Sequence, residues 1–329
     1  MTELGISVGW SPREEIDRVV SLIQVAEVRG VDACWVIDSQ LAMRDAFTLL
    51  AVLARETTRI QLGPGVTNML TRHETVLAAA LATLEHLAPG RILAGIGAGD
   101  SAVFPIGLQP QRISDLRTGS RRLRALISGS KVKLGQSQIR VAAGGTPAPP
   151  LYIAASQPRM LALAGEVADG VIVMGPANPD SFRIQMETVR NAAEAAGRDR
   201  ESVRIDLWVT MAVGDSGVDS VRSWASAQAR WLSGWESLPA SLARFESEFA
   251  RAAAQYDFAD HLSVTAGHAV GISDELALEL AVAGPVAKCQ ERLSEIIETG
   301  PDRVTVSLMS GGRERRLDDL LSVWKGVTA

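Results

Sequence analysis

The sequence contains few of the residues that form disulfides or bind metal ions. It has two cysteines and four histidines in 329 residues. Cys34 lies alone in a strand-like segment and Cys289 alone in a helix-like one, so neither a disulfide framework nor the Cys/His spacing of a metal site is indicated. We therefore expect buried structural thiols and no metal ion.

An excess of positive charge and long apolar runs are also missing. The chain has 33 Lys and Arg against 38 Asp and Glu, a formal net charge of -5, which offers no basic surface to nucleic acid or anionic lipid. No apolar run reaches the ~18 residues of a membrane-spanning helix, and the first residues are not a basic segment followed by a hydrophobic one. We expect a cytoplasmic protein that binds a small molecule, with no nucleic acid and no membrane involved.

Strand-like and helix-like segments alternate along the whole chain, which is typical of an α/β protein. Eight segments have strand character: residues 4–8, 33–37, 60–62, 91–96, 151–154, 170–173, 203–213 and 303–308. Eight βα units that close on themselves form a (β/α)8 TIM barrel, whose ligand-binding groups lie on the loops after the strands. The alternative is an open doubly wound sheet, which usually has fewer strands and a dinucleotide fingerprint.

Local signals predict where several helices begin and how they lead into the next strand. Residues 11–14, Ser-Pro-Arg-Glu, predict a helix capped by Ser11, and Thr71 with Glu74 predicts a capping box. Asp45 and Asn178 are further N-cap candidates. Three segments before strands are alike and predict one repeated helix-to-strand turn: Gly30-Val31-Asp32, Ala168-Asp169-Gly170 and Gly300-Pro301-Asp302.

Residues 214–284, between the seventh and eighth strands, interrupt this alternation with a mainly helical and aromatic insertion. Its aromatic residues are Trp224, Trp231, Trp235, Phe245, Phe249, Tyr256 and Phe258. An insertion of this length on the ligand-binding face often forms one wall of the substrate pocket. Packing between helices or a subunit interface explains the aromatic residues equally well. We expect residues 1–329 to form a single domain that includes this insertion.

The segment Gln61–Thr71 ends a predicted strand in glycines and then continues toward a helix. Gly63, Pro64 and Gly65 allow backbone angles that other residues avoid, so the main chain can bulge toward a flat ligand at the end of the strand. The simpler interpretation is an ordinary strand-to-helix turn.

Asp100 follows a second glycine-rich strand end, which reads Gly-Ile-Gly-Ala-Gly over residues 95–99. This pattern lacks the spacing of a nucleotide fingerprint. In a barrel, its glycines would let a flat ring lie against the main chain with Asp100 at the edge of that ring. Asp100 could then transfer a proton if an apolar environment raises its pKa. The alternative is a loop or cap aspartate.

Asp38, after the second predicted strand, points toward the same end of the barrel. Two carboxylates on neighbouring strands would make an acid/base pair, whereas the simpler interpretation is an aspartate that caps the next helix. His73 lies in the first turn of a predicted helix, where a capping or surface histidine is the alternative to a catalytic one.

Two neighbouring strand-to-helix junctions are candidates for binding phosphate. The first passes through Ala155 and Ser156, and the second passes through Gly175 and Pro176. Free N–H groups at a helix start bind phosphate, and two adjacent starts could hold a phosphorylated tail. Each junction taken alone is also consistent with a capped helix.

These segments together resemble the bacterial luciferase-like superfamily, and in particular its deazaflavin-dependent branch, which includes methylenetetrahydromethanopterin reductase. The resemblance covers nearly the full length. It is carried by residues 62–68 with Thr71-Arg72-His73, by residues 95–100, and by residues 163–170. It implies a TIM barrel with an insertion before the last strand, and a homodimer.

The resemblance also implies a cofactor site. In such proteins a non-proline cis peptide forms a bulge behind the ring of coenzyme F420, and here it falls at Gly65-Val66. By the same resemblance Asp100 and Asp38 lie near the reactive face of the ring. The implied cofactor-binding residues are Gly65, Val66, Thr67, Asn68, Gly97, Ala98 and Gly99 for the ring, with Ala155, Ser156, Gly175 and Pro176 for the phosphate.

The resulting hypothesis is an F420-dependent oxidoreductase that transfers a hydride between the deazaflavin ring and an organic substrate, with Asp100 or Asp38 handling the proton. Trp10, Ser39 and Trp231 are the candidate substrate-binding residues. Sugar-phosphate dehydrogenases of the family have histidine at the Ser39 position, and the methanopterin reductases have acidic residues near the first strand that this chain lacks, so the substrate stays open. The alternatives are a luciferase-like monooxygenase that uses FMN and oxygen, and a barrel that binds a ligand without catalysis.

Overall fold

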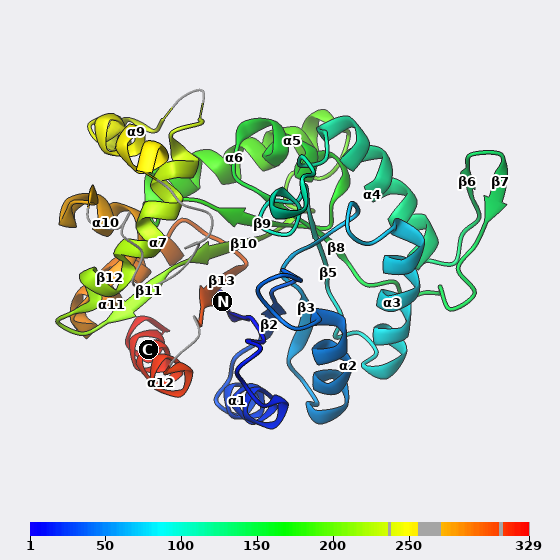
Figure 1. Cartoon of the computed structure of the whole chain (residues 1–329), viewed down its shortest axis with the longest axis horizontal. Coiled ribbons are helices and arrows are strands. Elements are labelled where there is room, and N and C mark those ends of the chain that lie inside the picture. The colour runs from blue at the N-terminus through cyan, green and yellow to red at the C-terminus, as the bar shows by residue number, and fades with distance from the viewer. Residues whose placement is uncertain (236–237, 256–270, 309–311, 329) are drawn as a thin grey trace.

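The structure is a computed structural model that describes residues 1–235, 238–255, 271–308 and 312–328. A nine-stranded parallel sheet curls into a barrel in the order β3-β2-β1-β13-β10-β9-β8-β5-β4 (Figure 1). The bounds are β1 Glu3–Val8, β2 Ala33–Val36, β3 Gln61–Pro64, β4 Thr67–Asn68, β5 Ala94–Gly97, β8 Leu151–Ala155, β9 Gly170–Met174, β10 Arg204–Val209 and β13 Arg303–Ser307.

The barrel has eight strand positions, because β3 and β4 are two halves of one strand divided at Gly65-Val66. The two edges of the sheet meet at this strand. Leu62 N donates to Arg91 O at 2.8 Å, and Leu93 N donates to Leu62 O at 2.8 Å. The predicted TIM barrel is therefore confirmed.

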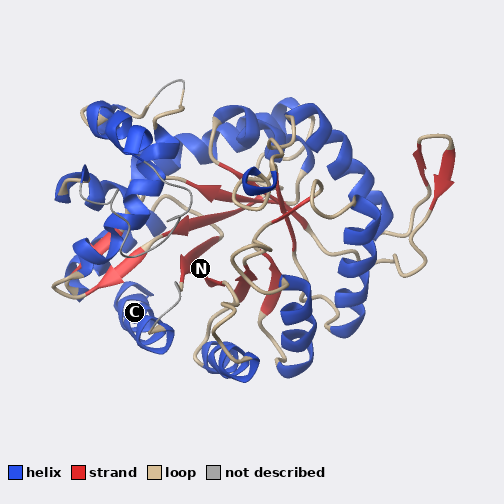
Figure 2. Cartoon of the chain, in the orientation of Figure 1, coloured by secondary structure: helices blue, strands red, loops and turns tan. Residues whose placement is uncertain are grey.

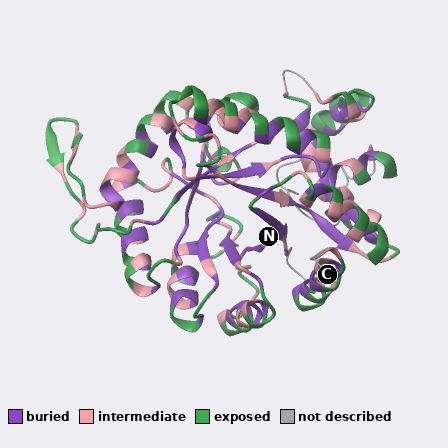
Figure 3. Cartoon of the chain, turned by 180° about the vertical axis from the view of Figure 1, so that it is seen from behind, coloured by how far each residue is buried: buried purple, intermediate pink, exposed green. Residues whose placement is uncertain are grey.

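Helices surround the barrel as an outer ring (Figure 2). Their bounds are α1 Ile16–Val28, α2 Ala46–Glu56, α3 Glu74–Leu87, α4 Ile113–Ile127, α5 Pro158–Val167, α6 Pro179–Ala195, α11 Val286–Ile297 and α12 Arg313–Thr328. Their buried sides face the strands and their exposed sides face outward (Figure 3). In α6, for example, Phe182, Met186, Val189 and Ala193 recur at helical spacing and are all buried. No helix in the described ranges is long and apolar enough to cross a membrane.

The insertion before the last strand is mainly helical in its described part, as predicted. It comprises α7 Gly217–Leu232, α8 Ala240–Ala243, α9 Glu246–Gln255 and α10 Asp274–Leu280. These helices enclose a second apolar cluster that includes Leu242, Phe249 and Leu276. The prediction of one strand over residues 203–213 is wrong, because β10 ends at Val209 and β11 Met211–Val213 pairs instead with β12 Val282–Gly284. Tyr256 and Phe258 lie outside the described residues.

Two short elements were not expected from the sequence. The hairpin of β6 Val132–Leu134 and β7 Ser137–Ile139 projects from the barrel (Figure 1). A single 3₁₀ turn, η1 Phe104–Ile106, lies in the long loop after β5.

Two of the predicted helix starts are wrong and two are confirmed. α1 begins at Ile16, because Ser11 and Glu14 form a separate turn in which Ser11 N donates to Glu14 Oε2. α3 is capped by His73, whose Nδ1 accepts from Thr75 N. Asp45 and Asn178 are N-caps as predicted, accepting from Thr48 N and Ser181 N.

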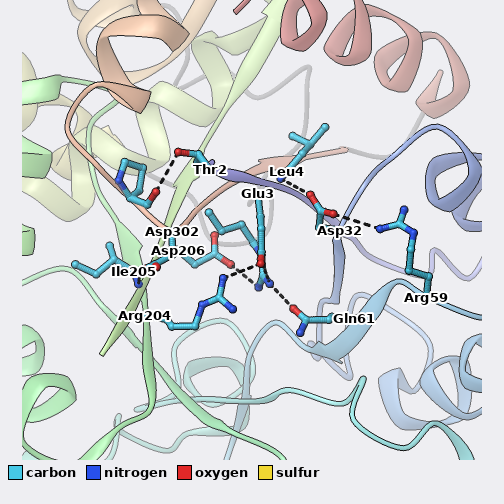
Figure 4. Close-up of polar contacts among 12 residues, drawn as sticks. Thr2, Glu3, Leu4, Asp32, Arg59, Gln61, Arg204, Ile205, Asp206 and Asp302 are labelled. Atoms are coloured by element: carbon cyan, nitrogen blue, oxygen red, sulfur yellow. Dashed lines mark hydrogen bonds and ion pairs between the residues drawn. The ribbon is translucent and has the colours of Figure 1, made fainter. Parts of the chain in front are cut away.

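The repeated helix-to-strand turn is confirmed, and its aspartates have one function. Each carboxylate accepts a hydrogen bond from a main-chain N–H at the start of the preceding barrel strand. Figure 4 shows this for Asp32 and Asp302. The pairs are Asp32 with Leu4 N at 2.9 Å, Asp169 with Leu151 N at 2.8 Å, and Asp302 with Ile205 N at 2.7 Å. The turn therefore sets the register between neighbouring strands.

A charged network closes the barrel at the amino ends of its strands (Figure 4). Arg303 pairs with Glu3 Oε2 at 2.6 Å and with Asp206 at 3.5 Å, and it also binds Gln61. Arg204 pairs with the other oxygen of Glu3 at 2.8 Å. Burial raises the pKa of Asp206, and the attraction of Arg303 acts in the opposite direction. This face of a TIM barrel serves stability, in contrast to the opposite end.

Candidate functional site

Four partly exposed apolar side chains line the carboxyl end of the barrel. They are Val66, Ala154, Met174 and Trp208, and we call them the apolar floor. They come from the bulge and from β8, β9 and β10, and they pack on the buried cluster of Trp35, Leu93, Tyr152 and Ile172. The floor is thus a surface of apolar side chains at the end of the barrel where ligands bind in this fold.

Trp35 fills the barrel interior beneath this floor. Its ring lies 5.4 Å from that of Tyr152 and 6.3 Å from that of Trp208, and its Nε1 donates to Asp206 at 2.9 Å. A Cβ on Gly65 would lie 2.6 Å from Trp35 Cβ, and one on Gly95 would lie 2.2 Å from Pro64 O. Both glycines are therefore required by close packing around Trp35, whether or not a ligand lies above.

The bulge has the predicted geometry. The Gly65-Val66 peptide bond is cis, and Gly65 N donates to Val36 O at 2.7 Å. Thr67 and Asn68 then pair with Ile96 and Gly97 of β5. The fold thus brings the two predicted ring-binding segments, residues 65–68 and 97–99, side by side.

Asp38 is buried, and both of its carboxylate oxygens are engaged. Oδ2 accepts from Thr67 Oγ1 at 2.6 Å and from Arg72 Nε at 3.0 Å, while Oδ1 accepts from Arg72 Nη2 at 3.2 Å. Oδ2 thus accepts two hydrogen bonds and Oδ1 accepts one, all from side chains of the protein. The geometry therefore favours a structural role for Asp38 over the expected proton transfer.

Asp100 is exposed on the loop after β5, so the apolar environment expected around it is not seen. That loop contacts the loop after β2. Ser39 Oγ lies 3.3 Å from Ser101 Oγ, and Gln40 Nε2 donates to Ala102 O at 2.7 Å. Ser39 and Asp100 therefore belong to one surface at the open end of the barrel.

The two candidate phosphate-binding junctions are joined by Gln185, which sequence reasoning missed. Gln185, on α6, donates from Nε2 to Ser156 O at 2.9 Å and to Met174 O at 3.4 Å. Its Oε1 is buried and has no hydrogen-bond partner among the described residues. Gln228, on α7, donates to Gly175 O at 3.3 Å. No local sequence signal marks either glutamine, because each reaches a strand end far away in the chain.

The remaining site candidates lie on separate elements. Trp10 follows β1, where its Nε1 donates to Glu14 O at 3.1 Å and Arg44 lies 5.3 Å above its ring. Trp231, on α7, packs against the apolar cluster of the insertion, and its ring lies 5.4 Å from that of Trp235. His73 acts as a helix cap, in agreement with the simpler interpretation.

The arrangement of bulge, floor and strand-end loops can be compared with known proteins. The model of the luciferase-like monooxygenase family matches residues 3–303. The chain belongs to this family.

Two relatives are similar to this chain in sequence. The 5,10-methylenetetrahydromethanopterin reductase of Methanolobus tindarius is 25% identical over 336 residues, which cover 95% of this chain and 97% of that protein. The F420-dependent glucose-6-phosphate dehydrogenase of Mycolicibacterium fortuitum is 30% identical over 245 residues, covering 66% of this chain and 70% of that protein.

Solved structures agree on the luciferase-like fold. The coenzyme F420-dependent tetrahydromethanopterin reductase of Methanopyrus kandleri superposes with a TM-score of 0.78 at 22% identity, covering 97% of each chain. The monooxygenase RslO1 of Streptomyces bottropensis gives a TM-score of 0.70 at 18% identity, covering 100% of each chain. At these identities the likeness concerns the fold.

Proposed function

We propose that this protein is an F420-dependent oxidoreductase that acts on an organic small molecule. The apolar floor beside the Gly65-Val66 bulge carries the proposal, because a flat, largely apolar ring needs such a surface. The choice of cofactor is supported by the similarity to 5,10-methylenetetrahydromethanopterin reductase over 95% of the chain and to F420-dependent glucose-6-phosphate dehydrogenase over 66% of it.

The residues present suit this cofactor. Residues 65–68 and 97–99 would contact the ring, and the main chain at Ala155, Ser156, Gly175 and Pro176 would contact the phosphate. The buried Oε1 of Gln185, which has no hydrogen-bond partner in the described part of the chain, lies beside these junctions and is an acceptor suited to a hydroxyl donor. When bound, reduced F420 supplies a hydride, and the protein supplies position and proton control.

Asp100 is the proposed proton donor or acceptor. It is exposed at the open end of the barrel, no side-chain partner is recorded for it among the described residues, and its loop is fixed to that of Ser39. Asp38 lacks this freedom. We therefore assign the proton transfer to Asp100 alone.

The surface around Asp100 favours a substrate with an apolar part. Large apolar side chains are exposed on the two joined loops, and we call them the apolar collar: Leu41 (62%), Phe104 (36%), Ile106 (46%) and Leu108 (41%). Residues 98–111 carry one charge, that of Asp100. Trp10 and Trp231 are the proposed further walls, offering stacking and apolar contact.

The alternative is an FMN-dependent monooxygenase. Membership of the luciferase-like monooxygenase family and the fold shared with RslO1 favour it. It uses the same floor, but with oxygen as the acceptor.

Rapid mixing without oxygen tests the proposal. We expect reduced F420 to be oxidised by the protein only when a neutral ketone or enone is added, at a rate that rises with the concentration of this acceptor. Oxygen consumption with reduced FMN, and no reaction of reduced F420 with any acceptor, would instead establish the monooxygenase.

We also propose that the single domain of residues 1–329 forms a homodimer through α3. Between Glu74 and Glu85 this helix carries no charged side chain. Val76 on its outer face is 55% exposed, and Ala79 and Thr83 are exposed beside it. An uncharged outer helix face of this kind is typical of an interface. The cytoplasmic location stays a prediction.

Light scattering after size-exclusion chromatography tests the dimer. We expect twice the chain mass for the unmodified protein and the single-chain mass for Ala79→Glu, because a charge would be buried without a partner. Ala195→Glu, at an exposed alanine of α6, is the control and should stay dimeric. A monomeric unmodified protein at micromolar concentration would disprove the interface.

A further inference from the structure

The loop between β4 and α3 closes on a single carboxylate. Thr67 is fully buried in β4, just before this loop, and Arg72 lies near the end of the loop; both donate to Asp38. Between them Asn68 Oδ1 accepts from Leu70 N at 3.0 Å and Thr71 N at 2.8 Å. The loop is therefore folded on itself and anchored at Asp38.

Arg72 extends this anchor to the next helix. Its Nη2 pairs with Asp45 Oδ2 at 2.5 Å, and its guanidinium lies 4.8 Å from the centre of the Phe47 ring. Asp45 caps α2 through Thr48 N. Partial burial acts to raise the pKa of Asp45, but hydrogen bonds from Arg72 and Thr48 outweigh this and lower it. The guanidinium thus joins the starts of α2 and α3 to the end of β2.

This network lies next to the predicted cofactor-binding segment. Thr67 directly follows the Gly65-Val66 bulge, and its neighbour Asn68 pairs with Gly97 of β5. Any shift of the Asp38 carboxylate would move Thr67 and, with it, the neighbouring Val66 of the apolar floor. A displacement of about 1 Å in a positioning group is enough to lower catalysis strongly.

We propose that Asp38, Arg72 and Thr67 form a positioning unit that holds residues 65–68 in the shape that receives the cofactor, and that Asp38 transfers no proton. This inference rests on the proposed function, since it assigns the cofactor-binding segment. It separates the two acids of the site: Asp100 acts on the reacting atoms, and Asp38 acts through Thr67 and Arg72.

Cofactor affinity and its pH dependence test the unit. Asp38→Asn and Arg72→Gln are each expected to raise the Kd for F420 by about 10-fold or more, and the double variant should bind no worse than the weaker single one, because both remove the same contact. At saturating F420, the pH profile of hydride transfer should keep its shape. The control is Arg122→Gln, which removes the 2.7 Å ion pair between Arg122 on α4 and the buried Glu74 on α3. This substitution should lower the melting temperature without changing the Kd for F420.

Hydrogen exchange of the protein without cofactor gives a second readout. The amides of residues 66–72 should exchange about 10-fold faster in Asp38→Asn, and at the unmodified rate in Arg122→Gln. Unchanged exchange and unchanged Kd in Asp38→Asn would overturn the proposal, as would the loss of one limb of the pH profile at unchanged Kd. If the unmodified protein binds no F420, the proposed function fails, while the exchange rates still decide whether Asp38 holds the loop.

Discussion

Asp100→Asn is expected to slow single-turnover hydride transfer by about 10²- to 10⁴-fold, the range that general acid–base catalysis supplies. The amide retains the size of the carboxyl and cannot carry the proton. Asp100 is exposed, with no side-chain contact recorded among the described residues, so the fold and the Kd for F420 should be unchanged. Stopped-flow mixing with saturating reduced cofactor and acceptor measures the rate.

Asp115→Asn, at an exposed aspartate in the first turn of α4, is the matched control and should keep the unmodified rate. An Asp100→Asn rate within about threefold of the unmodified one would leave this carboxylate without a chemical role. The site would then be a binding site, or its proton would come from elsewhere.

Arg303→Met is expected to lower the free energy of unfolding by about 3–5 kcal/mol, which is typical when one partner of a buried ion pair is removed. Arg303 and Asp206 are each 1% exposed, and Arg303 also forms an ion pair with Glu3. The substitution keeps most of the apolar volume but leaves Asp206 buried without its cation. Urea unfolding followed by circular dichroism measures the loss.

A second substitution tests this cause. Asp206→Leu added to Arg303→Met should recover part of the stability, because the uncompensated charge is gone. Arg18→Gln, in the exposed pair with Glu314, should leave the unfolding midpoint unchanged. If Arg303→Met costs less than about 1 kcal/mol, the network at the barrel's amino end does not stabilise the fold as described.

The barrel could be predicted from sequence because its signals are local. The Asp32, Asp169 and Asp302 turns each combine a helix end, a carboxylate and a strand start within a few residues. The two predicted caps failed because their residues are engaged in turns that precede the helices, although the bond from Ser11 N to Glu14 Oε2 is made. Glu14 accepts from Arg313, 299 residues away, at 2.7 Å, and Thr71 Oγ1 donates to Asn68 Oδ1 at 3.1 Å.

The candidate site could be predicted only in part, for the same reason. The bulge and the glycines could be predicted from the sequence. The absence of a side chain at Gly65 and Gly95 is explained by close packing around Trp35 as well as by a ligand. The partners of Asp38 were not foreseen, because Arg72 is 34 residues away and an isolated aspartate gives no sign of its neighbour. Gln185 likewise acquires its position only when β8 and β9 meet beside α6.

The central claim, that a deazaflavin lies on the apolar floor, is tested most directly by titrating the purified protein with F420 and, separately, with FMN, following the fluorescence of each cofactor. The account predicts saturable binding of F420 near one molecule per chain, weaker binding of FMN, and loss of F420 affinity when Ala154 on the floor is changed to Asp. Tight binding of FMN with negligible affinity for F420 would contradict it.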